Sequence, residues 1–219
     1  RRELKRDGFH AWLAAQPAGT VVAMEACSSA HYWGRACERH GLVPRLMAAQ
    51  FVKPFRKNAL VKNDRQDAEA IATAARQGNM RFVAVKDEAQ QVRLSWHRVR
   101  EGYKKDALAV RNRLRGLLAE FGIDIPQGIE RALLMARQIA DDEAPNVPAE
   151  AIKVVLTLSQ QVLEIHVRVR EMERDLQRWH RANELSQRLA TIPGIGPIGA
   201  SALAASVTDP HQFRSGRQF

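Results

Sequence analysis

Cysteine is scarce in this sequence, and long apolar runs are missing from it. The 219 residues include two cysteines, Cys27 and Cys37, too few for a disulfide framework, which fits a reducing compartment. No apolar run approaches the roughly 20 residues that a membrane span requires, and no signal-peptide pattern is present. The sequence therefore predicts a cytoplasmic protein with no membrane contact, and its hydrophobic content of 45% is enough for a core.

Acidic residues are also few in comparison with basic ones. Lys and Arg number 34 against 24 Asp and Glu, which gives a formal net charge of +10. Such an excess favours a polyanionic partner, because phosphate binding releases counterions and the protein's field steers the encounter. A generic basic surface would give the same balance, so charge alone only favours nucleic acid.

The two ends of the sequence lack the features of natural termini. The chain opens on Arg1 rather than Met and stops at Phe219 without a capping or tail signal. We therefore expect it to be a piece of a longer protein.

The first 86 residues alternate between helix-like and strand-like patterns. Buried strands are predicted over residues 20–25 and 42–47, and helices are predicted over residues 3–16, 28–40 and 64–77. Gly41 is a typical stop residue for the second of these helices. Alternation of this kind predicts an α/β layer with parallel strand pairing.

The rest of the chain is predominantly helical in pattern. Apolar residues recur every three or four positions over residues 87–121, which predicts one long helix. After an acidic, proline-bearing connector at residues 141–148, four consecutive heptads predict a coiled-coil seam. The seam positions are Val155, Leu158, Val162, Ile165, Val169, Met172, Leu176 and Trp179. The two long helices could pair within one chain or build a homo-oligomer, and the pattern fits both.

Three carboxylates stand where a catalytic site would be expected. Glu25 closes the apolar run at residues 21–24, and Asp64 and Asp67 lie three residues apart at the start of a helix. Helix capping by Asp64 is the simpler explanation for the aspartates, since acidic residues suit a helix N-terminus. With Glu25 and nearby basic residues, however, the cluster predicts Mg²⁺ binding, because two Mg²⁺ ions about 4 Å apart need several carboxylate oxygens. We therefore predict Glu25, Asp64 and Asp67 as metal ligands and catalytic residues.

Basic residues gather in two segments that we predict to contact nucleic acid. The first segment leads to the paired aspartates and contains Lys53, Arg56, Lys57 and Lys62. The second is the long helix at residues 87–121, where eight cations face only Glu101 and Asp106 over residues 93–115. On that helix we predict that Arg100, Lys104 and Arg111 contact the phosphate backbone of nucleic acid.

Residues 189–200 read Leu-Ala-Thr-Ile-Pro-Gly-Ile-Gly-Pro-Ile-Gly-Ala, a pattern similar to a helix-hairpin-helix element. Gly194 and Gly196 would let backbone amides approach a phosphate at the start of the following helix. A tight Gly/Pro turn between two packed helices would give the same pattern. We favour phosphate contact.

Taken together, these residues resemble the DEDD-type transposases of bacterial insertion sequences, the bridge-RNA-guided recombinases. The resemblance extends over nearly the whole chain. It is carried by residues 24–33, which contain Glu25, residues 45–55, residues 62–71, which contain Asp64 and Asp67, residues 81–83 and residues 192–196.

The resemblance implies a fold of the α/β plus α class in three parts. Residues 1–86 would be a RuvC-like domain of the ribonuclease-H fold that lacks its first strand. Residues 87–188 would be a helical coiled-coil region, and residues 189–219 the start of a C-terminal transposase domain.

The resemblance also implies an activity and its partners. Four carboxylates would bind Mg²⁺, a serine of the C-terminal domain would attack DNA, and a structured guide RNA would pair with the DNA. Glu25, Asp64 and Asp67 match the second to fourth acidic positions. The first Asp would lie upstream of Arg1, with Asp7 a poor substitute in a helix, and the serine would lie downstream of Phe219. We therefore expect this piece alone to be inactive.

Two other functions remain open at the level of sequence. One is a resolvase-like nuclease in which water activated by the metal attacks the phosphodiester. The other is a non-catalytic, basic coiled-coil protein that binds nucleic acid and whose acidic residues only cap helices.

Overall fold

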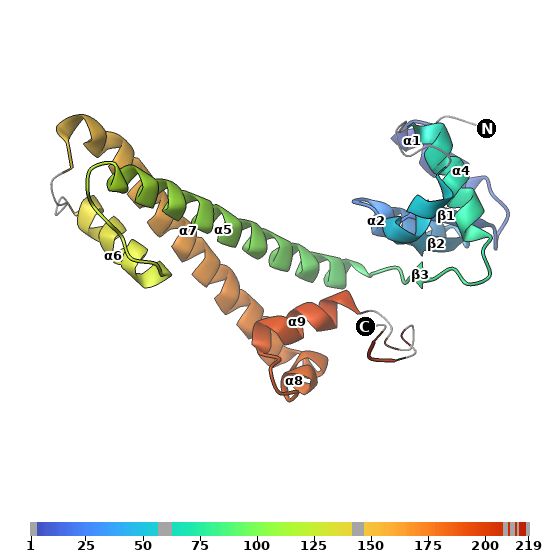
Figure 1. Ribbon diagram of the computed structural model, residues 1–219. Coiled ribbons are helices and arrows are strands. Elements are labelled where there is room, and N and C mark those ends of the chain that lie inside the picture. Colours follow the sequence, from blue (N-terminus) through green and yellow to red (C-terminus); the bar gives the residue numbers. More distant parts are fainter. Residues whose placement is uncertain are drawn as a thin grey trace. The chain divides into compact units, whose positions relative to one another are not determined.

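The computed structural model describes residues 4–56, 63–141, 147–207, 210, 213 and 215–217. Contacts divide the chain into two compact units, one made of residues 1–91 with 207–219 and the other of residues 92–206 (Figure 1). We call them the α/β unit and the helical unit. The predicted class, an α/β part followed by a helical part, is confirmed. The three-part division at residues 86 and 188 stays a prediction.

The α/β unit contains a small mixed sheet with the strand order β1-β2-β3. Strands β1 (Val21–Glu25) and β2 (Val43–Met47) pair in parallel, with Val21 opposite Val43 and Glu25 opposite Met47. This confirms the predicted parallel pairing for these two strands. Strand β3 (Phe82–Val83) pairs antiparallel to β2, so parallel pairing does not hold for the whole sheet. Only two residues long, β3 lies at a sheet edge, where a short segment can pair in either direction.

Helices flank the sheet. Those at residues 6–14, 30–39 and 64–75 lie at nearly the predicted positions, whereas the two short ones within residues 49–55 were not predicted. The helices are α1 (Arg6–Ala14), α2 (Ala30–Arg39), α3 (Ala49–Val52) and α4 (Asp64–Ala75), with the 3₁₀ helix η1 (Lys53–Phe55) after α3. Gly41 follows α2 with φ of 70°, the left-handed conformation that favours glycine after a helix. Two small cores result. Leu13, Val22 and Cys37 lie in the core on the α1 and α2 side, and Met47, Val52, Ala70 and Ala74 in the core on the α4 side.

The helical unit is built on two long helices and three shorter ones among the residues that the structure describes. These are α5 (Glu88–Ala119), whose first turn belongs to the α/β unit, α6 (Ile129–Ala140), α7 (Ala149–Ala182), α8 (Glu184–Ala190) and α9 (Pro197–Ser206). The predicted helix over residues 87–121 is confirmed as α5. Helix α6 was not predicted, although its buried Ala132, Leu133, Ala136 and Ile139 have helical spacing.

The heptad seam of α7 packs inside its own chain. Val155, Val162 and Ile165 are buried in one core with Val110, Leu114 and Leu118 of α5 and with residues of α6. Leu158 and Val169 pack against the same core. This is the within-chain alternative left open by the sequence. A coiled-coil supercoil and a homo-oligomer stay predictions.

In the described part of the chain, no helix combines the length and the apolar character that a membrane crossing needs.

Candidate active site

The structure brings two of the three predicted carboxylates to one place in the α/β unit. Glu25 is the last residue of β1, and Asp67 lies in the first turn of α4. Helix α4 packs against β1, so the end of the strand and the beginning of the helix are neighbours. The carboxyl ends of parallel strands are where open α/β sheets bind their ligands.

Arg56, the residue after η1, connects these carboxylates. Its Nη2 atom lies 3.5 Å from Oε2 of Glu25, and its Nε atom lies 3.1 Å from Oδ1 of Asp67. The exposed fraction is 28% for the Arg56 side chain and 23% for each carboxylate side chain. Partly buried carboxylates are costly without a positive partner. The guanidinium supplies that charge for both.

The contact between Arg56 and Asp67 has the distance of an ion pair but not the geometry of a hydrogen bond. The Nε atom of Arg56 is buried and has no hydrogen-bond acceptor within the described structure. A buried N–H group without an acceptor is destabilising. Arg56 therefore neutralises the two carboxylates electrostatically, but it does not satisfy all of its own donors there.

Asp64 does not cap α4. The N-cap is Asn63, whose Oδ1 accepts a hydrogen bond from the backbone N–H of Gln66 at 2.9 Å. Asp64 is the first residue of the helix proper and is exposed. The capping explanation for Asp64 is therefore wrong, because an amide side chain one residue earlier performs that function. Asp64 and Asp67 both still lie in the first turn, where the helix dipole favours negative charge.

Glu25 and Asp67 fit a divalent cation in their chemistry. Carboxylate oxygens are the ligands that Mg²⁺ prefers, and these two side chains already converge on one positive group. Over the described residues, no three His, Cys, Asp or Glu side chains gather closely enough to hold a metal ion. A ligand set that also includes Asp64 therefore stays a prediction.

The basic segment before α4 is described only in part. Lys53 lies in η1 and is exposed, and Arg56 contacts the carboxylates. Lys57 and Lys62 lie outside the described residues. Contact of this segment with nucleic acid stays a prediction.

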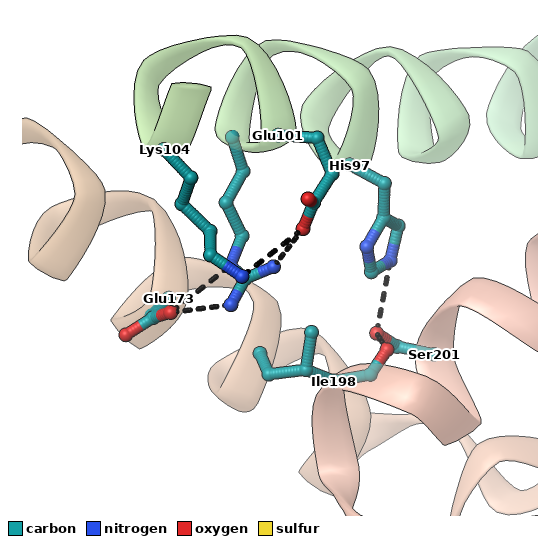
Figure 2. Close-up of polar contacts among 7 residues, drawn as sticks. His97, Glu101, Lys104, Glu173, Ile198 and Ser201 are labelled. Atoms are coloured by element: carbon teal, nitrogen blue, oxygen red, sulfur yellow. Dashed lines mark hydrogen bonds and ion pairs between the residues drawn. The ribbon is translucent and has the colours of Figure 1, made fainter. Parts of the chain in front are cut away.

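The cations predicted on α5 differ in their exposure and in their polar partners. Arg100 is only 12% exposed and donates from Nε and Nη2 to Oε1 of Glu173 on α7, at 3.0 and 2.6 Å. Lys104 is about half exposed and lies 3.6 Å from Oε1 of Glu101 (Figure 2). Arg111 is half-buried, and its Nε donates to the carbonyl of Ala107. Of these three, Lys104 has the most exposed charge, while Arg100 ties α5 to α7.

A buried histidine–serine pair that sequence reasoning missed lies in the helical unit. Nε2 of His97 on α5 is 3.0 Å from Oγ of Ser201 on α9 (Figure 2). The Ser201 hydroxyl donates to the carbonyl of Ile198 at 2.9 Å, so its only proton is used and His97 must donate from Nε2. Burial, with Arg100 and Arg93 nearby, lowers the pKa of His97, and Glu101 opposes this. His97 is therefore a neutral packing residue that joins α5 to α9.

The Gly/Pro segment forms an exposed turn between α8 and α9. Gly194 has φ of 88°, a conformation that glycine adopts without strain. Pro197 is the first residue of α9, where its missing N–H is not needed. Gly194 and Gly196 are both exposed. The turn between two helices is confirmed, and its contact with phosphate stays a prediction.

Comparison with known proteins gives two family matches. A family model for DEDD transposases of the IS110 group, described as "Transposase", matches residues 3–123. A second model, described as "Transposase IS116/IS110/IS902 family", matches residues 186–219. No solved structure matches the chain.

Curated relatives align with the chain from end to end. The "Probable family 20 transposase" of Pseudomonas aeruginosa is 41% identical over 220 residues, which cover 100% of this chain and 64% of that protein. The "Transposase for insertion sequence element IS1328" of Yersinia enterocolitica is 35% identical over 219 residues, with 100% and 64% covered. The "Transposase for insertion sequence element IS1111A" of Coxiella burnetii is 36% identical over 217 residues, with 99% and 59% covered. The chain thus spans less than two thirds of each of these relatives.

Proposed function

Because the chain belongs to the IS110 family of DEDD transposases, whose family model matches more than half of it, we propose that it is part of a DNA transposase of a bacterial insertion sequence. The observation that carries this proposal is the meeting of Glu25 and Asp67 at the end of β1 and the start of α4. Carboxylates from two separate elements converge there in a protein of strongly positive net charge. That combination fits chemistry on a phosphodiester.

We propose a RuvC-like, ribonuclease-H type of fold for residues 1–86. The parallel pairing of β1 and β2 supports it, as does the position of Glu25 at the carboxyl end of its strand. Helix α4 would supply the third and fourth acidic positions, Asp64 and Asp67, from its first turn. In this assignment residues 87–188 are the helical region, and residues 189–219 begin the C-terminal transposase domain.

In this proposal Glu25, Asp64 and Asp67 hold Mg²⁺. A bound Mg²⁺ would stabilise the charge that develops on the attacking and leaving oxygens of the phosphodiester. The protein's residues do the rest. The end of β1 fixes Glu25, and the first turn of α4 presents both aspartates. The limited exposure of Glu25 and Asp67, 23% each, restricts water around them.

The full-length protein allows a direct test by a strand-transfer assay on insertion-sequence ends. We expect Glu25→Gln, Asp64→Asn and Asp67→Asn each to lower the rate by at least about a hundredfold, since even outer-shell partners of a metal typically cost 10–100-fold. Asp7→Asn is the matched control, because Asp7 is an exposed carboxylate of α1 in the same unit. Unchanged rates in all three variants would leave only the non-catalytic function.

The same assay separates serine attack from attack by water. A covalent protein–DNA adduct trapped in the full-length protein would support a serine nucleophile. Free 5′-phosphate ends without an adduct would instead indicate the resolvase-like nuclease.

We also propose that the basic surface binds DNA and a structured guide RNA through the phosphate backbone. The positive net charge and the exposed Lys53 and Lys104 support this proposal. Binding measured as a function of salt concentration tests it: Lys53→Ala or Lys104→Ala would each reduce the slope of log K against log[salt] by about 1. Lys153→Ala, at an exposed position on α7, is the control and would leave the slope unchanged if the proposed contacts are correct.

A further inference from the structure

The position of Arg56 has a consequence for how the carboxylates would take up a cation. Its guanidinium contacts Glu25 through Nη2 and Asp67 through Nε. A divalent cation that bridged these same two oxygens, Oε2 of Glu25 and Oδ1 of Asp67, would occupy the space of the guanidinium. The guanidinium and the cation cannot both occupy that space, because their positive charges repel each other and they compete for the same carboxylates.

We propose that Arg56 is an internal competitor for the divalent cation, which holds Glu25 and Asp67 together until the cation displaces it. The inference rests on the proposed function, because it takes these two carboxylates as metal ligands. It adds a role for a residue that the sequence placed among the nucleic-acid contacts.

Three features of Arg56 support displacement rather than a permanent bridge. The contact to Glu25 is long for a charged hydrogen bond, at 3.5 Å. The contact to Asp67 lacks hydrogen-bond geometry, and Nε is left without an acceptor in the described structure. The side chain is 28% exposed, so part of it already faces water. A well-formed bidentate pair would be much harder to replace.

Arg56 also has a function without the cation. Glu25 and Asp67 are both largely shielded from water, and two such carboxylates repel each other when nothing positive lies between them. The guanidinium offsets the repulsion between the two carboxylates and so holds the end of β1 beside the first turn of α4. Its removal should therefore destabilise the cation-free protein, and a bound divalent cation should compensate for that loss.

Divalent-cation binding to the full-length protein and to its Arg56→Gln variant tests the inference, with Mn²⁺ followed by electron paramagnetic resonance as a probe for the Mg²⁺ site. No Mn²⁺ binding by either protein would reject the metal site and the inference with it. We expect Arg56→Gln to lower the Mn²⁺ dissociation constant by about five- to tenfold, because a ligand binds more tightly once a competing state is removed. Arg56→Lys keeps the charge but loses the planar fork. Its Mn²⁺ dissociation constant should lie between those of the unaltered protein and Arg56→Gln. Arg76→Gln removes the same charge from an exposed position at the other end of α4, and should leave the constant within about twofold of the unaltered chain.

Thermal unfolding of the same variants separates competition from a simple structural tie. If Arg56 is displaced, Arg56→Gln lowers the midpoint temperature without metal, and saturating Mn²⁺ removes the difference from the unaltered chain. An equal loss with and without Mn²⁺ would show that Arg56 stays in place and would overturn the inference.

Variants of the carboxylates distinguish this failure from failure of the proposed function. Mn²⁺ binding that is lost in Asp67→Asn but unchanged in Arg56→Gln would keep the metal site and reject the competitor. Mn²⁺ binding that is insensitive to Glu25→Gln, Asp67→Asn and Arg56→Gln alike would reject both.

Discussion

The two units of the chain use their charged side chains in different ways. In the α/β unit, Glu25, Arg56 and Asp67 come from three separate segments and meet at one end of β1. In the helical unit, Arg100 of α5 and Glu173 of α7 form an ion pair that joins the two long helices. The first arrangement concentrates charge at the place where we propose that a cation binds, whereas the second ties one helix to another. A cluster of charges is therefore informative about function when separate elements bring it together beside a small core.

The two units also differ in the size of their apolar cores. The core of the helical unit joins residues 103–118 of α5 and 155–169 of α7 with α6. The α/β unit has instead two smaller cores, one on the α1 and α2 side and one on the α4 side. We expect the helical unit to tolerate changes in its surface charge better than the α/β unit does.

The largest effect is expected when the core of the helical unit is opened. Leu114→Ala removes a fully buried side chain of α5 and should lower the free energy of unfolding by about 2–5 kcal/mol, since such a cavity does not collapse fully. Leu13→Ala, also fully buried but in a smaller core, should lie toward the lower end of that range. Chemical denaturation measures both.

Leu108→Ala on the same helix is the control for this comparison. Leu108 is 53% exposed, so its replacement should change the free energy of unfolding by less than about 0.5 kcal/mol. If Leu13→Ala cost more than Leu114→Ala, the contrast between the two cores would be wrong.

A medium effect is expected at two equivalent helix caps, one in each unit. Asn63 accepts a hydrogen bond from the N–H of Gln66 at the start of α4, and Asn183 accepts one from Ser186 at the start of α8. Each Asn→Ala change should cost about 1 kcal/mol of stability. Only Asn63→Ala should also weaken Mn²⁺ binding, because it loosens the turn that carries Asp64 and Asp67. Equal Mn²⁺ affinity in both variants would contradict this link between cap and site.

The smallest effect is expected from the pH dependence of the helical unit. Because the pKa of His97 is lowered from the ordinary value of 6.5, the unfolded chain binds the proton more readily than the folded protein does. The contribution of His97 to stability is therefore complete above pH 6.5, decreases as the pH falls toward the lower folded pKa, and levels off below it. The difference in unfolding free energy between the unaltered chain and His97→Gln, measured from pH 8 to pH 5, should shrink in that direction. A difference that does not change with pH would contradict the neutral assignment of His97.

Much of the fold was predictable from the sequence because it depends on local pattern. The strands ending at Glu25 and Met47 and the helix starting at Asp64 follow from apolar runs and stop residues. Helix α6 is as long as α4, and its buried apolar residues have helical spacing, so the sequence contains a signal for it that the prediction did not use. The direction of β3 could not be read at all, since two residues carry no periodicity.

The acidic residues of the site could be predicted from the sequence, but the contacts that they and their neighbours make could not. Acidic residues at the end of a strand and the start of a helix can be found in the sequence, since each position depends on a few neighbouring residues. That Asn63 rather than Asp64 caps α4 depends on which side chain reaches the N–H of Gln66, a choice made by local geometry. The pairing of His97 with Ser201, 104 positions apart, gave no sequence signal.

The sequence by itself therefore determined the family of the protein and much of the order of its elements, although α3, β3 and α6 were not predicted. Composition, periodicity and motif spacing can be read from the sequence alone, because none of them depends on which distant segments meet in the fold. Only the tertiary structure decided that Arg56 lies between Glu25 and Asp67 and that the heptad seam of α7 packs against α5 and α6 of its own chain. These contacts join segments far apart along the chain, and the apolar burial that folds the chain determines which of them meet.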